Sequence, residues 1–290
     1  MSMTPWRCGL LVAWSLGPLT GCQYILGLTE SAPADAGAIN DAVEPDDALV
    51  AMDGAPVGDG ALPVDAAVPP PITVGYWRME RDDDADGNRL STPNEIPGGQ
   101  PLMANDCVLD GQVPVSPIPA TGAVNDSSLE ALFTMDSTIA YDDVFDLDSL
   151  TVEFWARTSE NSAVLFGRTA DINTDGLVIE EPDAVRVRYV VSDGVGGSSA
   201  VDMATGVDMD EQWRHYAFTY DQATGVGCFY VDGAEATCHD GPDGFAIEWA
   251  AGVPIRVGQG LGGGAVNGGI LDELRISDGA LPPSRFLRAL

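Results

Sequence analysis

The feature that most constrains the fold of this chain is a succession of short β-type segments that begins after Pro71 and continues almost to the C-terminus. The clearest lies at residues 149–158, where the apolar residues Leu150, Val152 and Phe154 alternate with Thr151, Glu153 and Trp155. Such alternation is typical of a strand with one face against a core. Gly, Asp, Asn and Pro separate the segments, and no sustained helical period occurs before the last residues. We therefore predict an all-β domain over residues 72–290.

The other segments define the expected architecture. Further strands are predicted at residues 73–80, 107–113, 128–134, 163–169, 176–180, 185–192, 212–220, 225–231, 254–258 and 269–277. About a dozen strands without crossover helices favour antiparallel sheets packed face to face. Asp232-Gly233 provides the positive φ that a tight hairpin turn needs. A short C-terminal helix is expected near Pro282 and Pro283.

The N-terminal residues 1–21 are predicted to be a signal peptide. Arg7 precedes an apolar stretch of about a dozen residues, which is too short to span a bilayer. The sequence Leu19-Thr20-Gly21-Cys22 then resembles the lipobox of bacterial lipoproteins. The resemblance implies that Cys22 carries diacylglycerol and becomes an acylated N-terminus, which anchors the chain in a membrane. An ordinary cleaved signal peptide with a chance cysteine is the alternative.

Localisation follows from the same region. Gln23, in place of the Asp that favours inner-membrane retention in enteric bacteria, favours the outer membrane or the cell surface of the bacterial envelope. Residues 22–71, rich in Ala, Asp, Pro and Val, bury too little apolar surface to offset their ordering entropy. We therefore predict a disordered linker there, with an end-to-end distance of roughly 40 Å, that holds the folded domain away from the membrane.

The charge of the chain excludes one class of partner. The formal net charge is -32, and all 13 basic residues are Arg. Such a chain repels phosphate backbones, so nucleic-acid binding is not expected, and neither is docking to anionic lipid headgroups. Cations are the natural counterpart of this charge, and solubility in a salty exterior is the simpler explanation for it.

Several motifs of the folded part occur in the order found in one family. They are Gly75-Tyr76-Trp77-Arg78-Met79-Glu80, Thr151-Val152-Glu153-Phe154-Trp155, Trp213-Arg214-His215-Tyr216-Ala217, Phe229-Tyr230-Val231-Asp232-Gly233 and Gly269-Ile270-Leu271-Asp272-Glu273-Leu274-Arg275-Ile276. Together they resemble bacterial laminin-G-like (LamG-like) domains, which are jelly rolls of the concanavalin A type. The resemblance covers residues 72–290 and implies a two-sheet jelly-roll sandwich.

The resemblance also bears on activity, because relatives of this fold include glycoside hydrolases and polysaccharide lyases. Hydrolases of the laminarinase type carry alternating carboxylates on one strand, and no Glu-x-Asp-x-Glu run occurs in this sequence. We therefore expect a non-enzymatic module that binds glycan or protein at the cell surface. A structural or assembly role in the envelope without sugar binding is the alternative, and a hydrolase or lyase is the remote one.

Three residues of the folded part are candidates for binding a metal or a ligand. In related jelly rolls a structural calcium ion commonly joins the first strand to the last, and the matching acids are Glu80 and Asp272. Their alternative role is that of solvated or Arg-paired acids. Trp249 follows a segment bounded by Gly and Pro, so it is a candidate for stacking on a sugar. His215 is expected to be a hydrogen-bonded framework residue.

The cysteines give one further expectation. Cys228 and Cys238 flank the Asp232-Gly233 turn almost symmetrically, so strand pairing can bring them opposite each other within disulfide range. We predict a disulfide between them, with a stabilisation of roughly 2 to 3 kcal/mol. Cys107 is then either buried and inert or a partner in an alternative pairing.

Overall fold

The structure is a computed structural model that describes residues 72–80, 90–157, 163–171, 173–181, 185–207, 211–258 and 270–288. The predicted signal peptide (1–21), the predicted linker (22–71) and Cys22 lie outside these residues. Within the described ranges the regular structure is β, apart from the two 3₁₀ turns η1 (Asp143–Phe145) and η2 (Pro283–Arg285). These ranges contain no helix of the length and apolarity that a membrane span requires.

The strands follow the sequence in a regular series. They are β1 (Ile72–Trp77), β2 (Leu90–Thr92), β3 (Leu102–Asp110), β4 (Ser128–Ile139), β5 (Leu150–Arg157), β6 (Ala163–Arg168), β7 (Leu177–Glu181), β8 (Arg186–Ser192), β9 (Ser198–Ala204), β10 (Arg214–Asp221), β11 (Val226–Val231), β12 (Ala234–Asp240), β13 (Ala246–Ile247), β14 (Ile255–Val257) and β15 (Ile270–Asp278).

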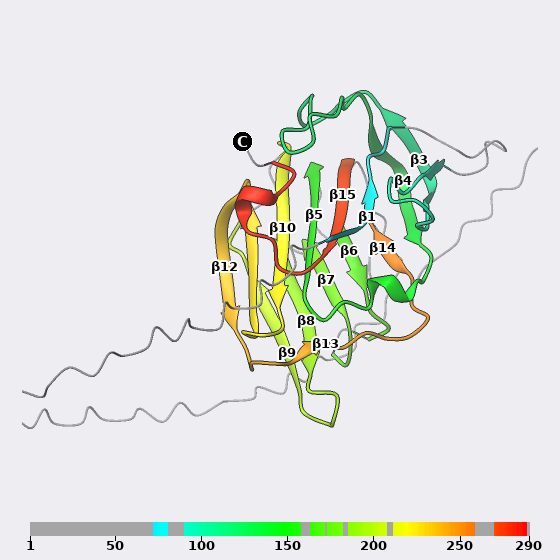
Figure 1. Ribbon diagram of the computed structural model, residues 1–290. Helices are drawn as coiled ribbons and strands as arrows, with labels where there is room; N and C mark the ends of the chain where they lie inside the picture. The colour runs from blue at the N-terminus through cyan, green and yellow to red at the C-terminus, as the bar shows by residue number, and fades with distance from the viewer. Residues whose placement is uncertain are drawn as a thin grey trace, which may run out of the picture. The chain divides into compact units, whose positions relative to one another are not determined.

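The strands form two antiparallel layers, which confirms the predicted sandwich (Figure 1). One layer runs β12-β11-β10-β5-β15, with β1 beside β15, and the other runs β14-β6-β7-β8, with β9 and β13 along β8. Strand β4 joins the layers, because Leu129 pairs with β15 and Ile139 pairs with β14. The path of hydrogen-bonded strands is therefore continuous at this edge.

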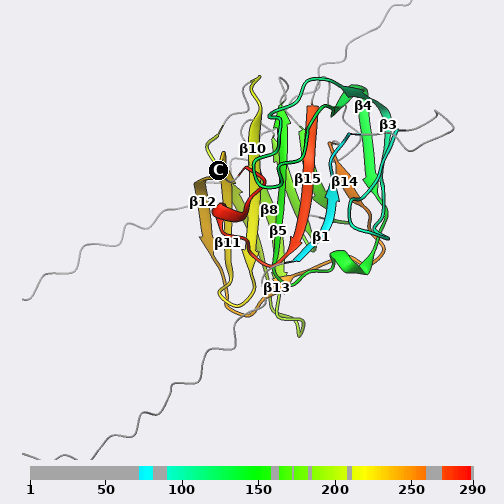
Figure 2. The same cartoon turned by 45° about the horizontal axis from the view of Figure 1, so that its top comes forward.

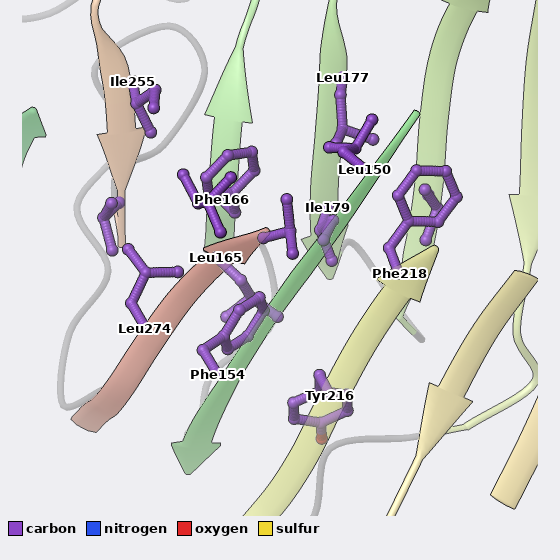
Figure 3. Close-up of a cluster of buried hydrophobic side chains, with 14 of the residues drawn as sticks. Leu150, Phe154, Leu165, Phe166, Leu177, Ile179, Tyr216, Phe218, Ile255 and Leu274 are labelled. Carbon is purple, nitrogen blue, oxygen red and sulfur yellow. The ribbon is translucent and has the colours of Figure 1, made fainter. Parts of the chain in front are cut away.

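The core lies between the layers (Figure 3). Phe154 of β5, Tyr216 and Phe218 of β10 and Leu274 of β15 face residues of the opposite layer, among them Ile179 of β7. These residues occupy the inward-facing positions, which are every second residue along a strand, as the sequence pattern predicts. At about 25 cal/mol per Å² of apolar surface, burial of each such side chain contributes about 1.5–3 kcal/mol to the stability of the fold.

The outward side chains of β5 are also buried, because the C-terminal residues 279–288, here called the strap, cross that face (Figure 2). Thr151 Oγ1 accepts from Leu281 N at 2.8 Å and donates to Gly279 O at 2.9 Å. Phe286 packs on the strap-facing side of β10 and β11, with its ring centroid 5.2 Å from that of Tyr230 and 5.9 Å from that of His215. Leu281 and Phe286 of the strap therefore form a second, smaller core with Ala217.

A buried carboxylate fixes the strap. Glu153 Oε2 accepts from His215 Nε2 at 2.9 Å and from Leu287 N at 2.7 Å. Its Oε1 accepts from Arg275 Nε at 2.7 Å and from Arg275 Nη2, which also donates to Arg285 O. The structure thus confirms that His215 is a hydrogen-bonded framework residue.

A second segment, residues 111–127, here called the cover, leads from β3 to β4 and meets the strap, since Ala120 N donates to Leu287 O at 3.2 Å. Ile118 of the cover is fully buried. Arg78, which follows β1, donates to Val124 O of the cover. The cover is therefore held against β1 at one end and against the strap at its centre.

Candidate functional site

Polar side chains from three separate parts of the chain meet beside β1 and β15. Glu80 follows β1, Asp272 and Glu273 lie in β15, and Asn125 and Asp126 lie at the end of the cover. Asn125 Nδ2 donates to Asp272 Oδ2 at 2.8 Å. The Asp126 backbone N–H donates to both Glu80 oxygens, at 2.9 and 3.1 Å. The cover thus contacts both acids that the sequence singled out, and we call these five residues with Tyr76 and Arg78 the acidic cluster.

A bulge in β15 places two successive acids in the cluster. The register with β5 shifts between Asp272 and Arg275, and Glu273 has a φ of 53°. A regular strand would send neighbouring side chains to opposite faces. Glu273 instead accepts a hydrogen bond from the Tyr76 hydroxyl, and its Oε1 lies 3.4 Å from Arg78 Nε.

Acidic residues outnumber basic ones in the cluster. Arg78 is the cation that pairs with Glu273 and, at 3.6 Å, with Glu80. Burial raises the pKa of Asp272 well above its ordinary value, and the charges of Glu273 and Glu80 add to the rise while the Asn125 hydrogen bond opposes it. Burial also raises the pKa of Glu273 to about 7, against the hydrogen bond from Tyr76.

Three buried oxygens of the cluster accept no hydrogen bond from the described residues, and one of them, Glu273 Oε1, has the ion pair with Arg78 Nε instead. Asp272 Oδ1 and Asn125 Oδ1 are buried and accept no hydrogen bond from the part of the chain that the structure describes. A buried acceptor without a donor costs about 1–3 kcal/mol. Calcium prefers carboxylate and amide oxygens at about 2.3–2.6 Å. The donor set of Glu80, Asp272 and Asn125 therefore fits the expected calcium ion, whose charge would favour the ionised form of the two acids.

The three carboxylates do not converge on one point. Across the described residues, the one group of three His, Cys, Asp or Glu side chains with ligand atoms within 4.8 Å of one another is Cys228, Glu235 and Cys238, whose cysteines are oxidised. Glu80, Asp272 and Glu273 consequently cannot all ligate one ion in their present positions.

Trp249 lies at another end of the sandwich. Its Nε1 donates to Leu147 O at 3.0 Å, and its half-buried ring packs against the core. The guanidinium of Arg168 lies 4.9 Å from the centroid of Trp249 and 5.2 Å from that of Tyr141. Arg168 also donates to Phe145 O, so a buried cation holds the two rings in place.

We call Tyr141, Arg168 and Trp249 the aromatic end, and Tyr141 is its more accessible ring. It is 37% exposed, and its hydroxyl donates to Asp146 Oδ2 at 3.2 Å. Arg168 also forms an ion pair with Asp146. No local pattern marks Tyr141 as a site residue, because Arg168 and Trp249, which lie beside it, are far along the chain. The ligand-binding role of Trp249 stays a prediction.

The predicted disulfide is confirmed. Cys228 of β11 pairs directly with Cys238 of β12, and their Cα atoms are 4.1 Å apart. The turn between the strands has positive φ at Asp232 (55°) and Gly233 (76°), as predicted. Cys107 Sγ contacts Asn105 O at 3.2 Å, so the alternative pairing of Cys107 with either of these cysteines is not adopted.

The loop between β6 and β7 has the residue spacing of a calcium-binding loop. Asp171, Asn173 and Asp175 precede Gly176, as in the first half of an EF-hand loop. Asp171 Oδ1 accepts from Asn173 N at 3.0 Å, and Asp175 Oδ1 accepts from Ala170 N at 2.8 Å. These carboxylates take part in hydrogen bonds within the loop.

A two-layer antiparallel jelly roll with a buried polar cluster joining its first and last strands defines a sandwich of the concanavalin A class. The family model Laminin_G_3, described as the concanavalin A-like lectin/glucanases superfamily, matches residues 134–285, just over half of the 290 residues. The chain belongs to this family. No curated protein sequence matches it.

Two solved structures share the fold. Domain 4 of AbnA, a GH43 extracellular arabinanase from Geobacillus stearothermophilus solved in complex with arabinotriose, is 15% identical with a TM-score of 0.53, over 75% of this chain and 97% of that chain. The binding domain of Paraclostridial Mosquitocidal Protein 1 is 15% identical with a TM-score of 0.54, over 75% of this chain and 51% of that chain. The present chain thus spans nearly all of the first and about half of the second.

Proposed function

We propose that this chain is a lipid-anchored, non-catalytic surface module that binds glycans. The observation that carries the proposal is its shared fold with the arabinanase domain solved in complex with arabinotriose, which the chain covers almost completely. Family membership supports the same reading. Because one fold can support several functions, the binding site is argued from this chain's own residues.

The strap covers one face of the sandwich and so excludes it as the sugar-binding surface. The outward face of β5, β10 and β15 is closed, with His215 fully buried and Trp155 6% exposed. A sugar ring therefore has no access to that face. The aromatic end offers Tyr141 and Trp249, whose rings are fixed by Arg168, and aromatic side chains with few free torsions bind at a small entropic cost. We place sugar contact there.

A non-catalytic role is supported by the burial of Glu153 and His215, the carboxylate and imidazole that most resemble a general acid-base pair. Glu153 and His215 are buried together under the strap, and both carboxylate oxygens accept hydrogen bonds from neighbouring groups. A general acid or base must reach the atom whose proton it transfers. This pair instead serves to fix the strap.

The anchoring part of the proposal rests on the lipobox at Cys22. Diacylglycerol on Cys22 with an acylated amine would attach the chain stably to the outer membrane or cell surface. Mass spectrometry of the N-terminal peptide from membranes is expected to show the lipid on Cys22 and its absence in Cys22→Ser. An unmodified Cys22 in the membrane fraction would refute the anchor.

We also propose that a structural calcium ion binds at Glu80 and Asp272. Thermal unfolding in millimolar calcium and in EDTA is the test. If calcium binds only the folded state, a free calcium concentration of about 100 times Kd raises the free energy of unfolding by about 2.7 kcal/mol. Identical unfolding temperatures in the two conditions would refute it.

The glycan proposal is tested with the full chain carrying Cys22→Ser, which removes the anchor. A glycan array that includes arabinotriose, read with and without calcium, is expected to show reproducible binding that falls in Tyr141→Ala and Trp249→Ala. Val195→Ala is the control, since Val195 is 90% exposed in another hairpin. A blank array in both conditions would overturn glycan binding and favour an envelope protein partner.

A further inference from the structure

We infer that Asn125 is a ligand of the calcium ion and that the bound ion clamps the cover onto the first and last strands. This inference rests on the calcium ion proposed above. It adds a third side-chain ligand to Glu80 and Asp272. It also assigns the ion a task, because the ion then holds a long loop in addition to two strands.

Asn125 and Asp272 present the buried acceptors of the cluster that have neither a hydrogen bond nor an ion pair from the described residues, whereas Glu273 Oε1 has its ion pair with Arg78. Asn125 is 1% exposed, Asp272 is fully buried, and each has one oxygen that accepts no hydrogen bond from the described residues. A buried acceptor that has neither a donor nor a cation costs free energy. A cation satisfies both oxygens at once.

The carboxamide can also turn towards an ion. Asn125 Nδ2 is 2.8 Å from Asp272 Oδ2. Because the two ends of a carboxamide have nearly the same shape, a half-turn places Oδ1 at that position. Two oxygens bound to one calcium ion at 2.3–2.6 Å lie about 3 Å apart. Asn125 therefore needs no backbone movement to become a ligand.

Glu273 is the competing third ligand, and its contacts argue against it. Its carboxylate accepts from the Tyr76 hydroxyl and pairs with Arg78 Nε. Glu80, Asp272 and Glu273 do not bring an oxygen each to within 4.8 Å of one another, although all three are described. Glu273 is thus engaged by Tyr76 and Arg78, while Asn125 remains available to the ion.

The same geometry explains the clamp. Asn125 and Asp126 are consecutive, and the second donates its backbone N–H to Glu80. An ion bound to Asp272, Glu80 and Asn125 would thus fasten the end of the cover by both residues. Upstream, Ile118 is buried and Ala120 N reaches Leu287 O of the strap. Loss of the ion would loosen the cover at its attachment to β1 and β15.

Two measurements on the Cys22→Ser chain test the inference. Isothermal titration with calcium chloride is expected to show one calcium site. Its affinity should be at least tenfold lower in Asn125→Ala. It should be no lower in Asn125→Asp, because this change keeps the oxygen and adds a charge. Hydrogen exchange of amides 118–126 is expected to slow on calcium addition, with the amides of β10 unchanged. Gln100→Ala is the matched carboxamide control, because its side chain donates to Asp142, outside the cluster.

The outcomes separate the proposals. Calcium affinity in Asn125→Ala equal to that of the parent chain would overturn the inference while leaving the calcium ion at Glu80 and Asp272 in place. If Asn125→Ala fails to fold, Asn125→Asp decides, and a tenfold loss of affinity there overturns the inference. A parent chain that binds no calcium overturns both, and the glycan array is read independently.

Discussion

Truncation of Glu153 to alanine is expected to be among the most destabilising single changes in this domain. The carboxylate is fully buried and accepts from His215, Arg275 and the backbone N–H of Leu287. Its removal leaves the Arg275 guanidinium, 13% exposed, without its anion. It also frees the end of the strap, because the Leu287 N–H loses its acceptor.

The magnitude follows from these contacts. Removing one partner of a buried ion pair costs about 3–5 kcal/mol. The free energy of unfolding of a whole domain is about 5–15 kcal/mol, so Glu153→Ala should remain folded but lose a large share of its stability. At about 2–4 °C per kcal/mol for a domain of this size, the Tm is expected to fall by about 10 °C. Glu153→Gln keeps the shape and one acceptor, so we expect a smaller loss, about 1.5–3 kcal/mol.

The assay is urea unfolding followed by tryptophan fluorescence, with thermal unfolding by circular dichroism alongside. Glu248→Ala is the control, since that side chain is exposed and such changes stay within about 0.5 kcal/mol. A loss below 1 kcal/mol in Glu153→Ala would show that the strap does not depend on this carboxylate.

Three further predictions concern other parts of the molecule. The double change Cys228→Ala and Cys238→Ala should lower the free energy of unfolding by about 3 kcal/mol through the lost loop constraint, and an unchanged urea midpoint would contradict this. In EDTA, the free energy of unfolding should fall by on the order of 3 kcal/mol as the pH rises from about 4.5 to 7. The reason is that Glu273 has a pKa of about 7 in the folded state, whereas the unfolded chain releases this proton at a lower pH. Urea midpoints across this range should be flatter in Glu273→Gln, and equal slopes in the two chains would refute the assignment. Arg168→Ala should cost about 2–4 kcal/mol and shift fluorescence to the red as Trp249 loses its cation, whereas an unchanged spectrum would argue against the stacked arrangement.

The sequence predicted the fold where the period of two was clear. Strand β5 and most other predicted strands lie within a few residues of their observed positions, because apolar residues alternate along them. Strand β9 was missed, since its Ser-Ser-Ala-Val-Asp-Met-Ala composition has low β propensity and it pairs with β8 alone. Tertiary pairing overrode that local preference.

Among the site residues too, those marked by a local sequence pattern were predictable and those that depend on long-range contacts were not. The Cys228–Cys238 bond was predictable, because both cysteines flank one hairpin turn. Asn125 was not, because it lies 147 residues from Asp272 and the cover carries no periodic pattern. Glu273 was part of a motif, but its place beside Tyr76 and Arg78 depends on a bulge that the sequence does not mark. Long-range contacts of this kind follow only from the assembled fold.

The pairing of β1 with β15, from Ile72 opposite Asp278 to Trp77 opposite Leu274, also sets the order of folding events. Strands so far apart in the chain meet only after a large loop has closed, and β sandwiches dominated by such contacts fold in milliseconds to seconds. Because β1 and β15 lie at opposite ends of the folded part of the chain, β1 gains its hydrogen-bonding partner only when the C-terminal residues are available. The domain can therefore close only when its last strand has arrived.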